Sequence, residues 1–436
     1  MKDGIYASLD IGTTSIKVII SEVLNGQLNV IGVGNERAQG MNRGVIVDIE
    51  KVSRAIENAV AQASERSGAV IHRIIVGVPS YQVHIDRCYG TQNVMADDQE
   101  IRREDVQAVI ERAVSNFAIN DQEVLSIKVD EFIVDGFNEI LDPQGMIGKR
   151  LEVNGTIYTV NRSVLHNIKK AVTHAGLNIE NFVLFPQAMA KYTLSPDERA
   201  FGTILVDMGG GQTTVSAIHD DKLKYTEIIP EGGQYITQDI SIVLNTSLKN
   251  SERLKREVGQ AYYELANPEH TVNVDIVGQK EPVAIKETYI AEIIEARLVQ
   301  ILEQVKAKLE AINALTLPGG IVISGGAATL PGIEQLAESI FEVPVRLYVP
   351  EQMGVRYPTF THAISLTAYQ AAQTDIEHII QMQLGTMIGT QDNYVERPTV
   401  DAEPEIADEA SEDYEEVSEE ESTGSKLKKF FLDFFN

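Results

Sequence analysis

The 436-residue sequence has a single cysteine, Cys88, and eight histidines. One cysteine cannot form an internal disulfide framework, and the histidines are scattered without HExxH or zinc-type Cys/His spacing. We therefore expect neither a disulfide-rich fold nor a transition-metal centre. Cys88 is expected to be a small packed residue, because free cysteines are often buried.

Long apolar runs and basic residues are also scarce. No stretch approaches the roughly 18 apolar residues of a membrane span. The first residues, MKDGIYASLDIG, include an acid and glycines where a signal peptide needs its apolar segment. We expect a cytosolic protein. With 37 basic and 64 acidic residues the formal net charge is -27, which argues against nucleic acid as a partner.

The length and the distribution of acids indicate how the chain is divided. At 436 residues with an apolar fraction of 43%, it exceeds the usual size of one core and should form two or more domains. Residues 391–424 hold fourteen Asp or Glu and one Arg, a charge of -13. Such a segment cannot bury enough apolar surface to offset its ordering entropy. We interpret 389–424 as a disordered linker and expect the folded body to end near residue 388.

Two segments of the body share one pattern. Residues 6–23, YASLDIGTTSIKVIISEV, and residues 202–223, GTILVDMGGGQTTVSAIHDDKL, each read as an apolar strand, an Asp, a turn with Gly and Thr, and a second apolar strand. Gly and Thr permit a tight turn, so each copy predicts a β-hairpin. Two hairpins this far apart predict two similar lobes.

The remaining segments alternate between helical and strand patterns. Apolar residues at three- and four-residue spacing predict helices over 48–68, 161–176 and 287–313. Strands between them make this an α/β protein. Cleaner apolar–polar alternation around a charged helix predicts an inserted α+β subdomain over 84–160, and a second insertion spans about 230–305.

The glycine-rich turns indicate phosphate chemistry. Asp10 and Asp207 each end a strand before a turn whose backbone amides could approach phosphate oxygens, while the carboxylates hold Mg2+ or its waters. Taken alone, DIGTT would be an ordinary turn. A third element, GGIVISGGAATLPGIEQLAESIF, predicts a strand, a Gly-Gly turn and a helix with free N-terminal amides, although glycines there could serve close packing. Together the three predict a clasp around a triphosphate.

These motifs resemble the nucleotide site of the actin, Hsp70 and sugar-kinase superfamily: LDIGTTSIK its first phosphate loop, VDMGGGQTT its second and VISGGAATLPG its adenosine motif. The resemblance implies an actin-like two-lobed ATPase fold of duplicated ribonuclease H-like domains that binds ATP and Mg2+, with Asp10 and Asp207 positioning metal and water. The residues that it places at the nucleotide are Gly12, Thr13, Thr14, Lys17, Gly209, Gly210, Gly211, Gln212, Thr213, Gly232, Gly233, Glu252, Lys255, Arg256, Gly325, Gly326 and Ala327. Without the resemblance, the charges of SERLKREVG would equally be a solvated helix face.

Within this superfamily, the loops, the insertion, the acidic linker and the chain end together are similar to the FtsA family of bacterial cell-division proteins. That similarity implies self-assembly into filaments and capture of the C-terminal peptide of FtsZ by the second insertion. It also implies attachment to the cytoplasmic face of the membrane at the division site and recruitment of later division proteins. The implied first lobe is 1–83, 161–200 and 362–388, and the second lobe is 201–229 and 306–361.

One departure from the superfamily affects the expected activity. Hsp70-like relatives have an acid before the proline of the connecting helix, but LFPQAMAKY has Phe185 at that place. Gln187 could orient the attacking water instead. Without a well-placed base, hydrolysis should be slow or absent, and we expect ATP to act mainly as an assembly ligand.

The chain ends in a short aromatic and basic segment, residues 425–436. On a helix, Leu427 and four phenylalanines gather on one face, opposite Lys429 and Asp433. A helix docked on the protein's own core is the common alternative, but the long acidic tether favours the interface of an anionic membrane. The residues assigned to membrane binding are Lys426, Leu427, Lys428, Phe430, Phe431, Phe434 and Phe435.

Three other functions remain open on the same fold. A sugar or acid kinase would need a catalytic Asp in the first lobe and gives no reason for the tethered end. An Hsp70-like chaperone carries a C-terminal substrate domain, for which the residues after 388 are too few and too polar. A pilus-type actin-like adaptor should lack the lipid-binding end.

Overall fold

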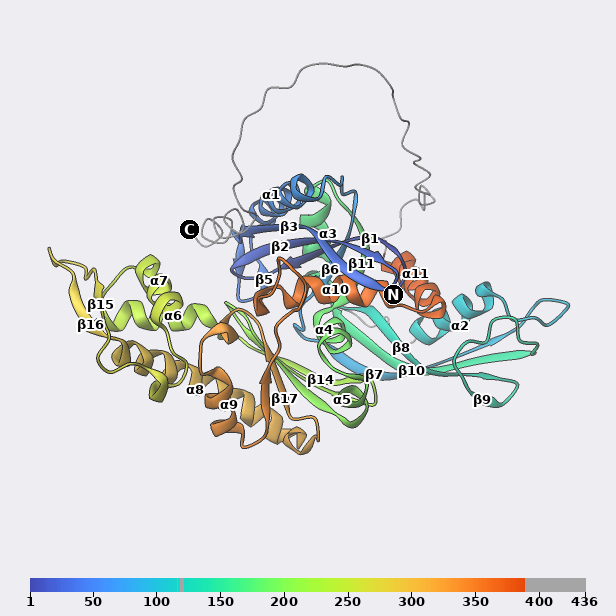
Figure 1. The fold of residues 1–436 in the computed structure, drawn as a ribbon. Coiled ribbons are helices and arrows are strands. Elements are labelled where there is room, and N and C mark those ends of the chain that lie inside the picture. Colours follow the sequence, from blue (N-terminus) through green and yellow to red (C-terminus); the bar gives the residue numbers. More distant parts are fainter. Residues whose placement is uncertain (116, 118–120, 389–436) are drawn as a thin grey trace, which may run out of the picture. The chain divides into compact units, whose positions relative to one another are not determined.

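The computed structural model describes residues 1–115, 117 and 121–388 (Figure 1). In this part of the chain, strands form two five-stranded sheets, one four-stranded sheet and two short two-stranded ladders. The expected linker, 389–424, and the expected C-terminal helix, 425–436, lie outside the described residues. Among the described helices, none is both long and apolar enough to cross a membrane.

The first sheet has the order β11-β6-β1-β2-β3. Its strands are β1 (Gly4–Ile11), β2 (Ser15–Leu24), β3 (Gln27–Arg37), β6 (Arg73–Val78) and β11 (Asn178–Leu184). The first three pair in antiparallel fashion as a meander, and β6 and β11 extend the sheet in parallel. The β1–β2 hairpin confirms the first predicted hairpin, and its register sets Asp10 directly opposite Lys17.

The second sheet repeats this topology with the order β14-β13-β12-β17-β18. Its strands are β12 (Thr203–Met208), β13 (Thr213–His219), β14 (Lys222–Ile229), β17 (Ile321–Ser324) and β18 (Val345–Leu347). Again an antiparallel meander is followed by two strands that add in parallel. The duplication expected from the two glycine-rich hairpins is therefore present in the pairing of every strand of both sheets.

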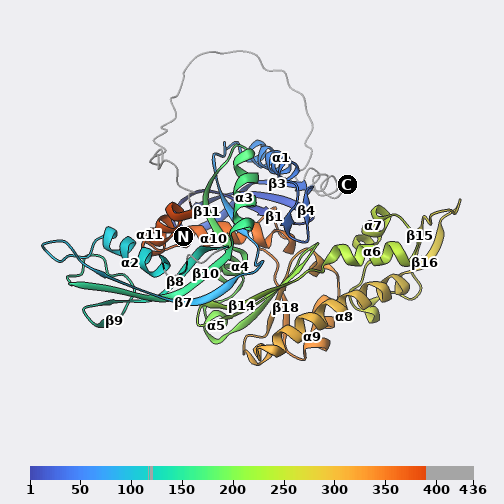
Figure 2. The same cartoon turned by 180° about the vertical axis from the view of Figure 1, so that it is seen from behind.

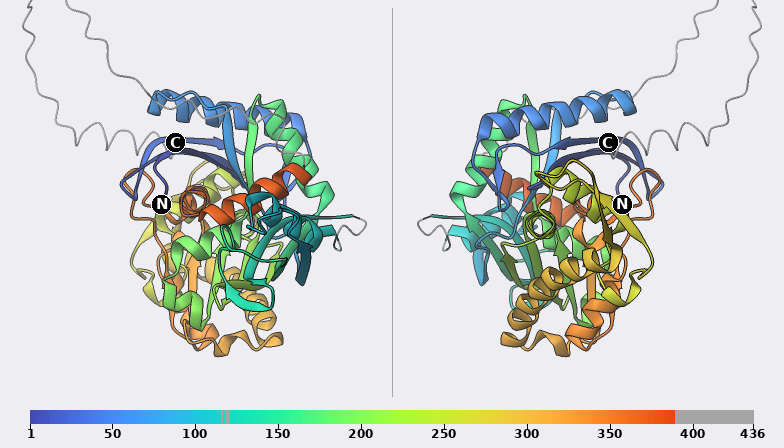
Figure 3. Two further views of the ribbon diagram at one scale, coloured as in Figure 1. Left: turned by 90° about the vertical axis from the view of Figure 1, so that its right-hand side faces the viewer. Right: turned by 90° about the vertical axis from the view of Figure 1, so that its left-hand side faces the viewer.

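Helices cover both faces of the first sheet. α1 (Ile49–Ser67) and α3 (Arg162–His174) pack on one face, and α10 (Thr361–Ala371) lies against β1, β2 and β6 on the other (Figures 1 and 3). α1 begins at the cap Asp48, whose carboxylate accepts from the backbone N–H of Lys51, and ends at Gly68 in a left-handed conformation.

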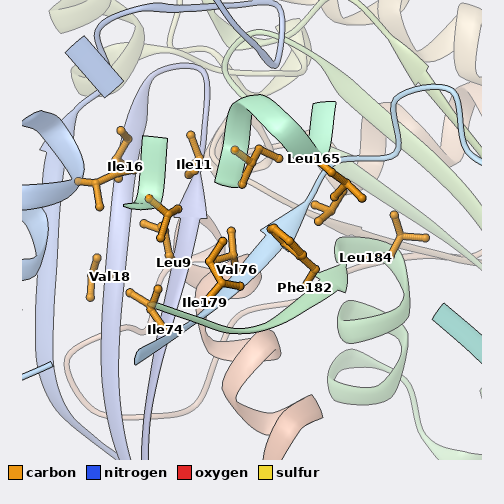
Figure 4. Packing of buried hydrophobic residues seen from close by; sticks show 14 of the residues in the cluster. Leu9, Ile11, Ile16, Val18, Ile74, Val76, Leu165, Ile179, Phe182 and Leu184 are labelled. Atoms are coloured by element: carbon orange, nitrogen blue, oxygen red, sulfur yellow. The ribbon is translucent and has the colours of Figure 1, made fainter. Parts of the chain in front are cut away.

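The core beneath α1 and α3 is mainly aliphatic. Leu9, Ile16, Val76 and Phe182 from four strands meet Leu165 of α3 in one cluster (Figure 4). Strands covered on both faces have near-continuous apolar sequences, which explains runs such as RIIVGV. On the second sheet, α8 (Glu287–Ala311) and α9 (Ile333–Phe341) cover an equivalent, mainly aliphatic core.

The first insertion is a separate α+β unit (Figure 2). Its sheet has the order β7-β10-β8-β9. Its elements are β7 (His84–Asn93), α2 (Arg103–Ser115), β8 (Gln122–Val134), β9 (Phe137–Ile140) and β10 (Arg150–Asn161). Cys88 is buried in this core, as expected for a packed residue. Burial raises the pKa of its thiol to about 11, so it remains a neutral thiol.

The last described helix, α11 (Asp375–Ile388), also belongs to this unit by its packing. Ile379, Ile380 and Leu384 join the cluster formed by α2 and the sheet of the insertion. The division expected from the sequence assigns residues 362–388, and with them α11, to the first lobe. Its apolar face instead completes the core of the insertion, and only residues 372–374 connect it to α10.

The second insertion consists of α6 (Gly233–Val243), α7 (Leu248–Val258) and a small ladder of β15 (Thr271–Val274) and β16 (Val283–Lys286). It leads into α8, which returns the chain to the second lobe. Other short elements are β4 (Met41–Asn42), β5 (Val45–Ile46), α4 (Phe185–Thr193) and α5 (Pro196–Phe201).

The structure corrects one detail of the third predicted element. The turn after β17 leads into a 3-10 helix, Ala327–Thr329, and α9 begins only at Ile333. Pro331 is the reason, because it disfavours α-helical backbone at Leu330, whose ψ is 125°. Backbone amides beside the Gly-Gly turn therefore belong to the 3-10 helix and not to α9.

The packing of α11 predicts that Leu384→Ala destabilises the insertion. The cavity left by this 3%-exposed side chain should lower the free energy of unfolding by about 2 to 4 kcal/mol. Hydrogen exchange should show the loss of protection in α2 before it reaches the first sheet. Met387→Ala, an exposed change in the same helix, is the control. Equal loss in both variants, or a loss first in β1 and β2, would contradict this packing.

Candidate nucleotide site

Asp10 and Asp207 occupy equivalent places, one in each lobe. Each is the last residue but one of its strand, β1 or β12. Side chains alternate across a strand, and the neighbours Leu9 and Met208 point into the cores under the helices. In each sheet the carboxylate therefore projects from the face opposite that core. Both side chains are nearly buried, with exposures of 4% for Asp10 and 11% for Asp207.

The two glycine-rich turns touch one another. A Cβ atom on Gly210 would lie 2.3 Å from Thr14 Cγ2, and one on Gly211 would lie 2.4 Å from Thr13 Cγ2. These distances are too short for any side chain, so the close approach of the two turns requires glycine at both positions. The backbone N–H of Gly44 donates to Thr13 Oγ1 at 3.0 Å, so the β4–β5 turn supports the first loop.

Gln212 follows the three glycines and packs against Gly44. Its Oε1 atom is buried and lacks a hydrogen-bond partner among the described residues. A buried carbonyl oxygen without a donor is costly, so this side chain is a candidate for contact with a ligand or its water. Thr213, the next residue, donates its hydroxyl to the carbonyl oxygen of Glu231 at 2.9 Å.

Lys17 and His362 provide the positive charge beside the carboxylates. Lys17 Nζ lies 3.1 Å from Asp10 Oδ2. The ring of His362 lies between the lobes, with Nδ1 3.7 Å from Asp10 Oδ1 and Nε2 3.2 Å from Asp207 Oδ2. Burial alone would raise the pKa of Asp10, but Lys17 and His362 outweigh it and lower the pKa to about 2. Burial would lower the pKa of His362, but Asp207 and Asp10 raise it to about 10.

Three glycines in the second lobe bring the remaining predicted segments together. Gly232 is the N-cap of α6 and Gly233 is its first residue. Both pack against the glycine-rich β12–β13 turn, where the N–H of Gly233 donates to the carbonyl oxygen of Gly209 at 2.9 Å. A Cβ on Gly233 would lie 3.2 Å from Ala327 Cβ and 3.7 Å from Lys255 Nζ. Gly325 has a φ of +101° and lies against the Asp207 carboxylate.

The charged residues of α7 form an ordered cluster and not a fully solvated face. Lys255 Nζ donates to Gly233 O at 3.0 Å, Thr237 Oγ1 at 2.8 Å and Glu252 Oε2 at 2.7 Å. Burial lowers the pKa of Lys255, and although burial would raise the pKa of Glu252, the nearby Lys255 lowers it. Arg256 lies further out and holds Glu252 Oε1 at 2.8 Å.

Gln187, a predicted site residue, does not lie beside Asp10 and Asp207. Its Oε1 accepts a hydrogen bond from Ser126 Oγ at 3.0 Å, in the first insertion. Phe185, two residues earlier, stacks on His362 with ring centroids 4.0 Å apart. Two residues on a helix are separated by about 200°, so when Phe185 faces the carboxylates Gln187 faces away.

His362 is the site residue that sequence reasoning missed. It lies far along the chain from Asp10 and Asp207, in the stretch YPTFTHAIS, which has no glycine-rich signature. A histidine at the start of a helix gives no signal of its own, and only the packing of α10 between the two lobes reveals its position.

The carboxylates can take part in metal binding but do not form a metal cage. Within residues 1–115, 117 and 121–388, no group of three or more His, Cys, Asp or Glu side chains is arranged to hold an ion. Mg2+ typically binds one or two carboxylates together with phosphate oxygens and waters. Two aspartates beside turns with free amides fit that requirement.

Comparison with known proteins identifies the family. A model described as "Cell division protein FtsA" matches residues 204–365, and one described as "SHS2 domain inserted in FTSA" matches residues 81–159. The chain is 44% identical to cell division protein FtsA of Enterococcus faecalis over the full length of both chains. The chain belongs to the FtsA family of cell division proteins. The FtsA of Streptococcus pneumoniae is 45% identical over 87% of this chain and 83% of its own, and that of Bacillus subtilis is 38% identical over 86% and 85%.

Two solved structures share the fold at low sequence identity. A chain of the PilM-PilN type IV pilus biogenesis complex superposes with a TM-score of 0.56 at 16% identity, covering 85% of this chain and 99% of that one. MreB5 of Spiroplasma citri bound to ADP superposes with a TM-score of 0.52 at 14% identity, covering 84% and 95%. These likenesses confirm the actin-like α/β fold. Membership of the FtsA family decides against the kinase, the chaperone and the pilus adaptor.

The contact between Gly325 and Asp207 predicts a strong effect of one methyl group. Gly325→Ala should lower the free energy of unfolding by about 2 to 4 kcal/mol, because its φ is unfavourable for alanine and its Cβ would lie 2.7 Å from Asp207 Oδ1. The adjacent Gly326→Ala is a matched control, since its φ of -67° is ordinary and its Cβ would have 3.9 Å of space. Urea unfolding measures the free energy of unfolding of both variants. Equal losses of stability in the two variants would refute the contact.

Proposed function

We propose that the protein binds ATP with Mg2+ between the β1–β2 and β12–β13 turns. The observation that carries this proposal is the approach of Asp10 and Asp207, one from each lobe, to opposite nitrogens of a single imidazole ring. Glycine-rich turns beside both carboxylates offer backbone amides to phosphate oxygens. A structural relative, MreB5, has ADP bound, which supports the same use of this fold.

Each part of the site has a role in this proposal. Asp10 and Asp207 hold Mg2+ or its waters, and the ion, when bound, neutralises phosphate charge. The turn amides of residues 12–14 and 209–213 cradle the phosphates. Gly233, Ala327 and the 3-10 helix line the nucleoside, and Lys255 and Glu252 border it from α7, where Lys255 already donates to Gly233 O.

We infer that ATP serves as an assembly ligand more than as a fuel. A general base must lie within hydrogen-bond reach of the attacking water. Phe185 has no group for this role, and Gln187 is engaged with Ser126. With neither residue able to position water, hydrolysis should be slow, and bound ATP can stabilise the assembling conformation for long periods.

We further propose the division role that the FtsA family suggests. Assembled on the cytoplasmic face of the membrane at the division site, the protein would hold the FtsZ C-terminal peptide on the second insertion and recruit later division proteins. Residues 425–436 would attach it to lipid. Partial burial of four Phe and one Leu at about 1 to 2 kcal/mol each would let a single tail bind the membrane reversibly. Filaments that align many tails would convert this weak binding into avidity.

The nucleotide proposal predicts that Asp207→Ala weakens Mg-ATP binding and assembly together. Loss of one of the two metal-facing carboxylates should reduce ATP affinity about tenfold or more, and light scattering should report the same loss of assembly. Asp86→Ala, an exposed carboxylate in the first insertion, is the control. If Asp207→Ala bound Mg-ATP as tightly as the control, the site would lie elsewhere.

The membrane proposal predicts that deleting residues 425–436 abolishes binding to anionic vesicles and leaves ATP binding unchanged. Within the tail, Phe434→Ser should weaken co-sedimentation, whereas Asp433→Ser on the opposite face should preserve or strengthen it. Sedimentation is measured with and without Mg-ATP. Nucleotide-dependent pelleting of the full chain supports coupling of assembly to attachment, and unchanged pelleting of the truncated chain would remove the tail from the proposal.

A further inference from the structure

Glu287 is a buried charged residue outside the nucleotide site. Among the described residues, the other acidic or basic residues that are buried are Asp10, Lys17 and Asp207. Glu287 is the first residue of α8 and is 7% exposed. A carboxylate is costly to bury unless it is hydrogen-bonded, so its partners indicate its role.

The partners of Glu287 come from the α7–β15 loop, residues 259–270, which leads from α7 to β15 (Figure 1). His270 Nδ1 lies 2.6 Å from Oε2, and the backbone N–H of Asn267 and the side chain of Gln260 donate to Oε1 at 3.2 and 3.5 Å. The backbone N–H of Glu287 donates to His270 O at 3.0 Å. Burial would raise the pKa of Glu287, but these hydrogen bonds lower it, so the carboxylate stays charged and holds the loop at both ends.

The middle of the same loop lies on the segment that would line the nucleoside. The backbone N–H of the buried Ala261 donates to Pro331 O at 2.7 Å. A Cβ atom on Gly332 would lie 2.8 Å from Leu265 Cδ1 and 3.0 Å from Tyr262 Cβ. Pro331 and Gly332 lie just beyond the 3-10 helix that follows the Gly-Gly turn. Because the packing is this close, the loop and the nucleoside segment must move together.

The end of the loop continues directly into the β15–β16 ladder. The first pair of this ladder, Thr271 opposite Lys286, lies next to the contact between His270 and Glu287. Val274 is the one buried residue of the ladder. A two-stranded ladder is marginally stable by itself, so the order of this one depends on contacts such as that of His270 with Glu287.

We propose that the α7–β15 loop couples the nucleoside end of the ATP site to the β15–β16 ladder, and that Glu287 is the positioning residue that fastens the loop to the ladder. This inference rests on the proposed nucleotide site. ATP bound against residues 325–332 restrains Pro331 and Gly332, and the loop transmits that restraint to the second insertion. By thermodynamic linkage, a partner that orders the ladder raises the affinity for ATP by the same factor as ATP raises the affinity for that partner.

Hydrogen exchange of the full chain, with and without saturating Mg-ATP, tests this coupling. In the wild type, Mg-ATP should slow exchange in the phosphate turns, residues 12–14 and 209–213, and also in the ladder, residues 271–286. In Glu287→Ala the turns should gain the same protection, whereas the ladder should gain none. Glu287→Gln, which keeps the shape and one acceptor oxygen, should retain part of the ladder response. Glu292→Gln, at an exposed carboxylate of the same helix, is the control and should match the wild type.

Binding constants separate positioning from general destabilisation. The loop packs on residues 331 and 332 of the nucleoside segment. Glu287→Ala should therefore weaken ATP binding about fivefold or more. It should leave the affinity for Mg-tripolyphosphate unchanged, because that ligand has no nucleoside. An equal loss of affinity for both ligands would mean that the variant disturbs the whole second lobe, and the role assigned to Glu287 would be wrong.

The exchange data also distinguish failure of the coupling from failure of the ATP proposal. Protection of the turns without protection of the ladder in the wild type would overturn the coupling alone, as would equal ladder protection in the wild type and Glu287→Ala. A wild type in which neither the turns nor the ladder respond would refute the ATP proposal and the coupling with it. If Glu287→Ala does not fold, His270→Ala removes one partner of the carboxylate and should lose part of the ladder response. An undiminished response in His270→Ala would contradict the coupling.

Discussion

The approach of two buried carboxylates to one another is the constraint on which the central part of this structure depends. Asp10 and Asp207 come from different lobes, and like charges separated by one imidazole ring cost on the order of a few kcal/mol at the effective dielectric of a protein. Lys17 and His362 offset that repulsion, and the serines that tie α10 to both sheets hold one of these cations in place. The glycines of the second loop permit the same approach sterically.

Much of this arrangement could be predicted from local sequence. A strand that ends in Asp before glycines predicts a tight turn into a second strand. Two such patterns predicted both hairpins, the duplicated sheets and the juxtaposition of residues 10–14 with 207–213. The helices over 48–68, 161–176 and 287–313 followed from their periodicity, because each buries a single apolar stripe. Lys255 and Glu252 were assigned through the family resemblance; in the structure the two pair with each other, and Lys255 also donates to Gly233 O.

The remaining features depend on contacts between distant segments. Gln187 was predicted from its place near a proline, but the direction of a side chain on a helix depends on which neighbour takes the inner face, and here Phe185 does. His362 had no motif, and its role arises only because α10 packs between the lobes. α11 was grouped with the helix it follows, although its apolar residues are complementary to the core of the insertion. Sequence periodicity identifies such a face but not its partner.

The contact between Gly77 and Phe185 has a consequence for the tolerance of this chain to substitution. A side chain at Gly77 would meet Phe185 first, so its absence makes room for the ring on which His362 stacks. Positions 77, 185 and 362 are therefore sterically coupled in this chain. A side chain at position 77 would require a smaller residue at position 185, and the imidazole of His362 would then lose its stacking partner. A substitution in a strand of the first lobe is in this way coupled to the ring between the two carboxylates.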